Sequence, residues 1–218
     1  MSDKKLFVWD LHGTLECGNE MAVIHLSNEV LAYRGYSERF SESQAIRLYG
    51  LKWWQYFRSL LPEQESYIWH ALQEDCFQLS ERDLRTQADC MSPSPRSHEV
   101  LSEIGKMHDQ ILVSNTRPTN LLGFISELGL NAFFSEGKFF AVDGHSDFRA
   151  TKEKVIDDYL ANHPKFDSII VIGDSGTDMR LGRHVGGIRV LYNHEYLPRK
   201  NVEAEIYTSD LRDVLKLI

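Results

Sequence analysis

The sequence has little cysteine and lacks the spacing that would indicate disulfides or a structural metal. Only three cysteines occur in 218 residues, Cys17, Cys76 and Cys90, and no two of them form a C-x-x-C pair. An odd number of cysteines without that spacing argues against a disulfide framework and against a zinc site. We therefore expect three reduced structural thiols.

Long hydrophobic runs and runs of basic residues are also missing. The apolar stretch that ends before Asp10 is too short for a signal peptide or a membrane span. Acidic residues number 32 and basic residues 24, which gives a formal net charge of −8 and disfavours nucleic acid as a partner. These features predict a cytoplasmic protein that binds neither membranes nor nucleic acid, and they leave its oligomeric state open.

The apolar residues that are present form short runs separated by helix-like stretches. Hydrophobic residues make up 42% of the chain, an ordinary value for a globular protein. Four runs end close to glycine, asparagine or aspartate, as buried strands do: Leu6–Trp9, Ile111–Val113, Ile169–Ile172 and Ile188–Leu191. Helices are expected at Ser97–Met107, Pro118–Leu128, Thr151–Ala161 and Asp178–His184. This alternation predicts an α/β fold, with a parallel sheet covered by helices on both faces.

A last helix is expected to begin near Ser209, and either Ser209 or Asp210 could cap it. Its apolar residues would lie on one face at α-helical spacing: Leu211, Val214, Leu215 and Ile218.

Between Gly18 and Cys90 the pattern is helical throughout. Four helices are expected there: Met21 to Gly35, Ser41 to Gly50, Trp53 to Leu61 and Glu63 to Leu79. We interpret residues 16–90 as an inserted helical domain and residues 1–15 with 91–218 as the sheet domain. Six aromatic residues are expected in the core of the insertion and in its contact with the sheet domain: Trp53, Trp54, Tyr56, Phe57, Tyr67 and Trp69.

Four segments carry most of the polar chemistry, each after a predicted strand or at the start of the next helix. They are Asp10-Leu-His-Gly-Thr14, Ser114-Asn115, Lys152 and Gly173-Asp-Ser-Gly-Thr-Asp178. Open parallel sheets bind their ligands at this position. In content and order, these segments resemble the four motifs of the haloacid dehalogenase superfamily, whose first motif is Asp-x-Asp-x-Thr. The resemblance extends from Leu6 to Ile218, and the helical insertion lies where the family's C1 cap belongs.

The resemblance implies a Rossmann-like core with an inserted all-helical C1 cap. It also implies a magnesium-dependent phosphatase that hydrolyses a small phosphorylated metabolite. The C1-type insertion and the segment Leu128–Phe134 are similar to the phosphoglycolate phosphatase-like branch. In such an enzyme Asp10 would be the nucleophile, and water would hydrolyse the resulting aspartyl-phosphate.

The resemblance also implies the metal ligands. Asp10, Asp174 and the backbone carbonyl of His12 would bind Mg²⁺ directly, and Asp178 would support the ion or its waters. These hard oxygen ligands would help to neutralise the negative charge of a phosphate monoester.

Substrate phosphate would be bound by Ser114, Asn115 and Lys152, and Lys152 would also restrain Asp10. Lys154 is an alternative to Lys152, which we prefer because Ile156, four residues after it, matches the apolar position that the family has there. Arg117 could contact substrate or lie exposed at a helix start.

The sequence departs from the family pattern at His12, where phosphatases of the family carry a second aspartate that transfers protons. Histidine can also donate or accept a proton near neutral pH, although this one could instead have a purely structural role. Two alternative functions stay open. One is hydrolysis of a C–halogen or C–P bond, since such enzymes also replace the second aspartate; the pair Asp174 and Asp178 argues against a dehalogenase. The other is a non-catalytic phosphate-binding or regulatory protein.

Overall fold

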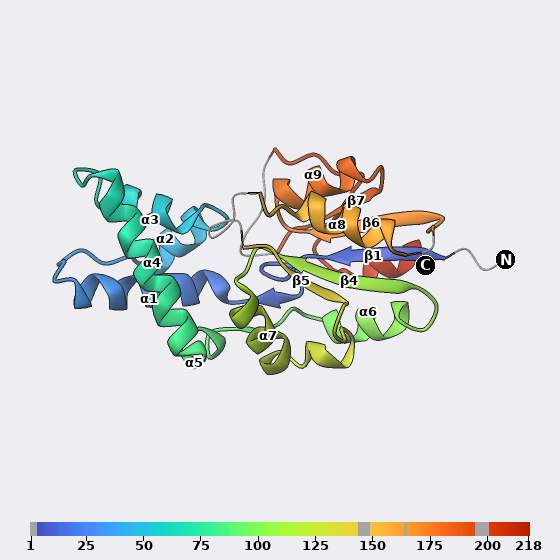
Figure 1. Cartoon of the computed structure of the whole chain (residues 1–218), viewed down its shortest axis with the longest axis horizontal. Coiled ribbons are helices and arrows are strands. Elements are labelled where there is room, and N and C mark those ends of the chain that lie inside the picture. The colour runs from blue at the N-terminus through green and yellow to red at the C-terminus, as the bar shows by residue number, and fades with distance from the viewer. Residues whose placement is uncertain (1–3, 144–148, 164, 195–200) are drawn as a thin grey trace. The chain divides into compact units, whose positions relative to one another are not determined.

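The chain forms two compact units in the computed structural model, which describes residues 4–143, 149–163, 165–194 and 201–218 (Figure 1). One unit comprises Met1–Cys17 and Pro93–Ile218, and the other comprises Gly18–Ser92. We call them the sheet unit and the helical unit. None of the described helices is both long and apolar enough to cross a membrane.

The sheet unit is built on six parallel strands in the order β5-β4-β1-β6-β7-β8. Their bounds are β1 Lys5–Trp9, β4 Asp109–Ser114, β5 Phe139–Ala141, β6 Ser168–Gly173, β7 Ile188–Tyr192 and β8 Ile206–Thr208. The central strand β1 places Trp9 beside Leu112 of β4 and Ile172 of β6. Asp10 therefore follows directly at the middle of the sheet's carboxyl edge.

Helices cover both faces of this sheet. They are α6 (Ser97–Ile104), α7 (Pro118–Glu127), η1 (Leu130–Ala132), α8 (Lys152–Ala161) and α9 (Gly176–His184). Figure 1 shows α8 and α9 on one side of the strands and α6 and α7 on the other. Leu6, Val8 and Val171 of the sheet belong to one core cluster with Ile156 of α8 and Leu181 of α9. The architecture is the Rossmann-like α/β fold expected from the sequence.

The C-terminal helix differs from the expectation. Asp210 caps it by accepting a hydrogen bond from the backbone N–H of Arg212 at 2.9 Å, but the element η2 (Leu211–Leu217) is a 3₁₀ helix. With about three residues per turn, Leu211 and Val214 share a buried face. Ile218 is 37% exposed, so the expected α-helical face was wrong for this residue.

The helical unit contains five helices in its described chain: α1 (Asn19–Tyr33), α2 (Glu42–Leu48), α3 (Trp53–Leu60), α4 (Ser66–Arg82) and α5 (Leu84–Ala88). Ser41 opens α2 through a capping box with Gln44, as the sequence pattern suggested. The short helix α5 was not expected. A two-stranded sheet pairs β2 (Glu16–Cys17) with β3 (Ser92–Pro93), the two segments at which the chain passes from one unit to the other.

Aromatic side chains form much of the core of the helical unit. Tyr56 and Phe57 are buried, and the partly buried Trp53 and Trp69 pack against the same core. Their indole N–H groups donate to Ser27 Oγ at 2.7 Å and to the carbonyl of Leu61 at 2.9 Å. Tyr67 was wrongly expected in this core, because at the start of α4 its side chain is 69% exposed.

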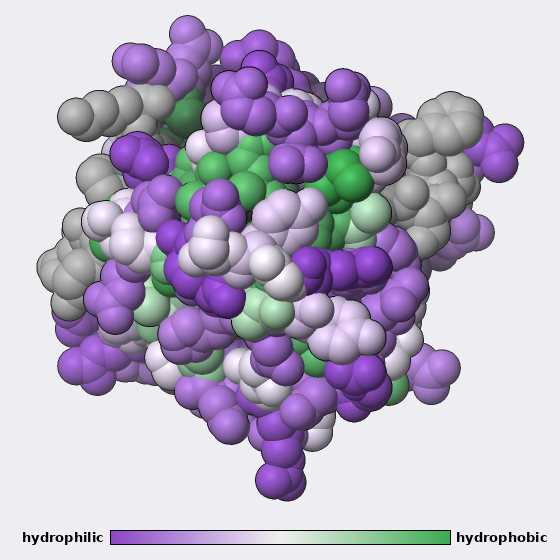
Figure 2. All heavy atoms as spheres, turned by 90° about the vertical axis from the view of Figure 1, so that its left-hand side faces the viewer, coloured by the Kyte–Doolittle hydropathy of each residue, from purple (hydrophilic) through white to green (hydrophobic). Residues whose placement is uncertain are grey.

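The surface view is mostly hydrophilic, with smaller hydrophobic areas (Figure 2). Large exposed hydrophobic residues of the helical unit include Tyr33, Ile46 and Leu51 besides Tyr67. They come from three different helices and, for Leu51, from the segment between α2 and α3, and single exposed apolar residues are normal on soluble domains.

Candidate active site

Asp10 is fixed at the carboxyl end of β1 by its own backbone. Its N–H donates to the carbonyl of Ile172 at 2.9 Å, which continues the pairing with β6 for one residue beyond the strand. The chain then turns sharply, because the N–H groups of Thr14, Leu15 and Glu16 all donate to the carbonyl of Leu11 at 3.0–3.2 Å. Gly13 adopts a φ of 77°, which glycine tolerates without a steric penalty. The nucleophile candidate is therefore held by a strand on one side and a tight turn on the other.

Lys152 reaches the same place from the first residue of α8. Thr151 caps this helix by accepting a hydrogen bond from Lys154 N–H at 3.2 Å. The Lys152 ammonium is buried and donates to Asp10 Oδ1 at 2.6 Å and to Asp178 Oδ1 at 2.7 Å. The rival Lys154 is exposed. Of the two lysines, the structure brings Lys152 into the site.

Asp178 is held by the start of α9. Its Oδ2 accepts hydrogen bonds from Ser175 N–H at 3.2 Å and Ser175 Oγ at 2.5 Å, as the N-terminal capping box of the helix. Gly173 ends β6 directly behind it, and a Cβ at this position would overlap the Cβ and Cγ of Asp178. A glycine is thus needed for the helix start to approach the strand end.

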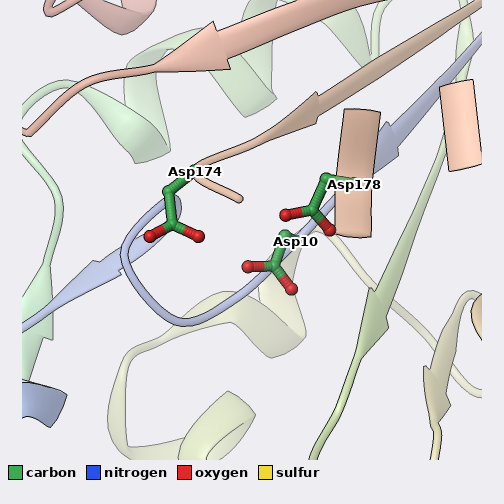
Figure 3. A group of neighbouring side chains, drawn as sticks. All are labelled: Asp10, Asp174 and Asp178. Atoms are coloured by element: carbon green, nitrogen blue, oxygen red, sulfur yellow. The ribbon is translucent and has the colours of Figure 1, made fainter. Parts of the chain in front are cut away.

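Three buried carboxylates meet at this edge. Asp10, Asp174 and Asp178 each offer an oxygen, and these three atoms lie within 4.8 Å of one another (Figure 3). With the Lys152 ammonium, the group carries three formal negative charges and one positive charge. Two negative charges are therefore not balanced within it.

The charges perturb one another strongly. Burial and the neighbouring carboxylates of Asp178 and Asp174 raise the pKa of Asp10 to about 7, although Lys152 opposes this shift. Burial alone would lower the pKa of Lys152, but the attraction of Asp10 and Asp178 is larger and raises it above its ordinary value. Lys152 is accordingly a cation at any physiological pH.

The residues fit a hard divalent cation. Carboxylate oxygens are preferred ligands of Mg²⁺, and an ion of charge +2 would match the excess negative charge of the cluster. Both oxygens of Asp178 already accept hydrogen bonds from Lys152 and Ser175. Asp10 Oδ2 accepts no hydrogen bond from any described residue. This difference favours Asp10 over Asp178 as a direct ligand.

Of the two residues expected from the second motif, one is buried and one is exposed. Ser114, the last residue of β4, is buried, and its Oγ lies 2.8 Å from Thr116 Oγ1. Asn115 between them is exposed, whereas Thr116 is buried and was missed from the sequence. Arg117 is mostly covered, with Nε 3.8 Å from Asp143 Oδ2. The strand-to-helix turn thus presents two neighbouring hydroxyls.

His12 interacts with a residue that sequence reasoning also missed. Its Nδ1 lies 2.7 Å from Oε2 of Glu16, whose side chain is fully buried. The ring meets Phe124 of α7 edge-on, with centroids 5.5 Å apart. The signal in the sequence was an acidic residue within a short turn after the first motif.

The parallel sheet therefore carries three buried carboxylates and a buried lysine at its carboxyl edge. The sequence profile of the haloacid dehalogenase-like hydrolases matches residues 7–192, so the chain belongs to this family and is a hydrolase. The search of curated proteins gave no significant match.

Solved structures share the fold at low sequence identity. A predicted phosphoglycolate phosphatase from Haemophilus somnus aligns with a TM-score of 0.76 at 17% identity, over 100% of this chain and 99% of its own. A putative phosphatase from Clostridium difficile gives 0.75 at 15% identity, over 99% and 100%. A haloacid dehalogenase-like hydrolase from Streptococcus pneumoniae gives 0.75 at 16%, over 100% and 99%. At these identities the likeness establishes the fold.

Proposed function

We propose that the chain is a magnesium-dependent phosphatase that hydrolyses a small phosphorylated metabolite through an aspartyl-phosphate on Asp10. The observation that carries this proposal is the buried contact of Lys152 with Asp10, inside a cluster of three carboxylates. A nucleophilic carboxylate held by a cation at the edge of a parallel sheet suits attack on phosphorus.

The charge of the site accounts for the metal requirement. A phosphate monoester is anionic, and the four-residue cluster already has more negative than positive charge. Mg²⁺ would be held by Asp10, Asp174 and the His12 carbonyl, and it would supply the positive charge that lets phosphate approach a carboxylate. Asp178 would act mainly by orienting Lys152, since its oxygens are engaged by Lys152 and Ser175.

Each site residue has its own function in the proposed reaction. One carboxylate oxygen of Asp10 attacks phosphorus, while the other would face the ion and Lys152, which bonds Oδ1 in this structure. The bond from phosphorus to the leaving oxygen breaks, and Lys152 stabilises charge on the phosphoryl oxygens. Water then attacks the phosphorus of the aspartyl-phosphate, which frees inorganic phosphate and restores Asp10. The Ser114 hydroxyl and the backbone N–H of Asn115 would hold the phosphoryl group from the second motif.

His12 would move the protons of the reaction. Its imidazolium would protonate the leaving oxygen, and the neutral ring would then accept a proton from the attacking water. In phosphatases of the family a second aspartate transfers these protons. The proposed activity therefore requires that His12 can take over that function.

We also propose that the helical unit, Gly18–Ser92, is the cap that sets substrate choice. It is inserted between the first and second motifs, where the family carries its C1 cap. Substrate selection would then depend on α1 to α5, while the chemistry depends on the sheet unit.

The experiment is a hydrolysis screen with an aryl phosphate and a panel of phosphorylated metabolites, each with Mg²⁺ and with a chelator. Phosphate release that requires Mg²⁺ supports the proposal. Halide release from a haloacid, without metal, would instead indicate a dehalogenase. Phosphate binding without turnover would indicate a non-catalytic protein, and both of these results would contradict the proposal.

A further inference from the structure

The imidazole of His12 is held from two sides. Nδ1 lies 2.7 Å from Glu16 Oε2, and the ring of Phe124 meets the imidazole at an interplanar angle of 75°. The side chain of His12 retains 18% exposure, whereas that of Glu16 has none. One end of the ring is thus anchored in the interior by a carboxylate.

The backbone places Glu16 opposite His12. Gly13 N–H donates to the carbonyl of Glu16 at 3.0 Å, and Glu16 N–H donates back to the carbonyl of Leu11 at 3.1 Å. His12 and Glu16 also form an isolated β-bridge. Because these bonds close the turn, the two side chains meet through the geometry of the first motif itself.

Full burial of a carboxylate is energetically unfavourable. Taking it out of water costs several kcal/mol unless hydrogen bonds or ion pairs offset the loss, and an apolar side chain of similar volume avoids that cost. A carboxylate bonded to Nδ1 does, however, fix which imidazole nitrogen carries the proton and how the ring is turned.

We propose that Glu16 is a positioning residue for His12. Its carboxylate accepts the hydrogen bond from His12 Nδ1–H, so Nε2 is the nitrogen that exchanges protons during phosphate ester hydrolysis. The inference rests on the proposed function, because it assumes that His12 carries protons in the reaction.

The proton balance follows from this arrangement. As the bond from phosphorus to the leaving oxygen breaks, that oxygen takes the Nε2 proton. As water attacks the aspartyl-phosphate, Nε2 takes a proton from the water and the ring returns to its first state. The Nδ1 proton stays between His12 and Glu16 throughout. Without Glu16, the ring could turn or carry its single proton on the wrong nitrogen.

A mutant cycle tests the proposal. Glu16→Leu removes the acceptor and keeps most of the volume, Glu16→Gln keeps an acceptor oxygen, and each is combined with His12→Ala. We expect Glu16→Leu to lower kcat on alkyl phosphates by roughly 10- to 100-fold, with KM nearly unchanged. Glu16→Gln should recover most of that loss. In the His12→Ala background, Glu16→Leu should have no further effect.

Two results would overturn the proposal. One is a kcat of Glu16→Leu within about twofold of the wild type, and the other is an equal loss in the His12→Ala background, which would indicate a structural effect. If Glu16→Leu does not fold, Glu16→Met takes its place in the cycle. The exposed glutamate Glu99 supplies the control, since Glu99→Gln should leave kcat unchanged.

A second readout does not require activity. Nitrogen-15 NMR of the His12 ring, assigned by its loss in His12→Ala, should show the proton on Nδ1 in the wild type and a mixture of tautomers in Glu16→Leu. Identical spectra would contradict the proposal. If the wild type hydrolyses no phosphate ester, the proposed function fails, and these spectra still decide whether Glu16 fixes the ring.

Discussion

The ammonium of Lys152 lies 2.6 Å from Oδ1 of Asp10, a residue 142 positions earlier in the chain. The ammonium also lies 2.7 Å from Oδ1 of Asp178. One buried cation therefore ties together the ends of β1, α8 and α9. The stability of this edge of the sheet and its proposed chemistry depend on the same two contacts.

Replacing Lys152 should damage both folding and activity. Lys152→Met leaves Asp10 and Asp178 buried without their cation, and breaking a buried ion pair costs roughly 3–5 kcal/mol. Urea denaturation without metal should show that loss, and phosphatase activity should be abolished. Lys154→Met is the matched control, since Lys154 is exposed and should change neither quantity. Equal behaviour of the two variants would show that Lys152 is not the site lysine.

Asp174 and Asp178 should differ in their importance for metal binding. Asp178 already accepts hydrogen bonds from Ser175 and Lys152, so Asp174→Ala should weaken Mg²⁺ binding far more than Asp178→Ala. Asp178→Ala should also lower the free energy of unfolding, because it removes a helix cap and a partner of Lys152. Calorimetric Mg²⁺ titrations with equal affinities for both variants would refute the assignment.

Gly173 should tolerate no side chain. The added Cβ of Gly173→Ala would overlap Asp178, so α9 must shift away from β6 and the variant should lose stability and Mg²⁺ affinity together. At Gly176, on the first turn of α9, a Cβ would come no closer than 3.9 Å to its nearest neighbour, Arg180 Nη1. Gly176→Ala should therefore be neutral or slightly stabilising. Thermal melts that rank the two variants in the opposite order would contradict the packing argument.

A surface pair should stabilise the edge strand β8 in a pH-dependent way. Arg189 of β7 bonds the carboxylate of Glu205, which lowers the pKa of Glu205 to about 2. Because this pKa is lowered on folding, the stabilisation is present above the ordinary value of about 4.5 and is lost as the pH falls toward 2. Glu205→Gln should melt slightly below the wild type at neutral pH, and the difference should shrink in acid. A difference independent of pH would exclude the ion pair as its cause.

The sequence predicted the fold where its signals were long enough. The four runs that begin at Leu6, Ile111, Ile169 and Ile188 are continuous apolar segments, and all four are strands of the sheet. β5 and β8 were missed because a strand of three residues, such as Phe139–Ala141, has no readable periodicity. The 3₁₀ form of η2 was missed because apolar spacing alone did not distinguish three residues per turn from 3.6.

For the site, the order of the motifs predicted which residues form it, and the structure shows the contacts between them. The resemblance favours Lys152 over Lys154 because Ile156 matches an apolar position of the family, and the burial of Lys152 beside Asp10 agrees with that preference. Glu16 was missed because its contact with His12 arises from a turn closed by backbone hydrogen bonds. Thr116 was missed because one exposed residue separates it from Ser114, and side-chain direction in a turn follows no simple period.

The central claim, nucleophilic attack by Asp10, is tested most directly by comparing the wild type with Asp10→Asn. The amide has the shape of the carboxylate but no anionic oxygen to attack phosphorus or bind a cation. With Mg²⁺ and an aryl phosphate as substrate, the account predicts phosphate release by the wild type. It predicts a loss of roughly 10⁴-fold or more in kcat for a folded Asp10→Asn protein. Magnesium-dependent turnover by Asp10→Asn at a rate near that of the wild type would contradict it.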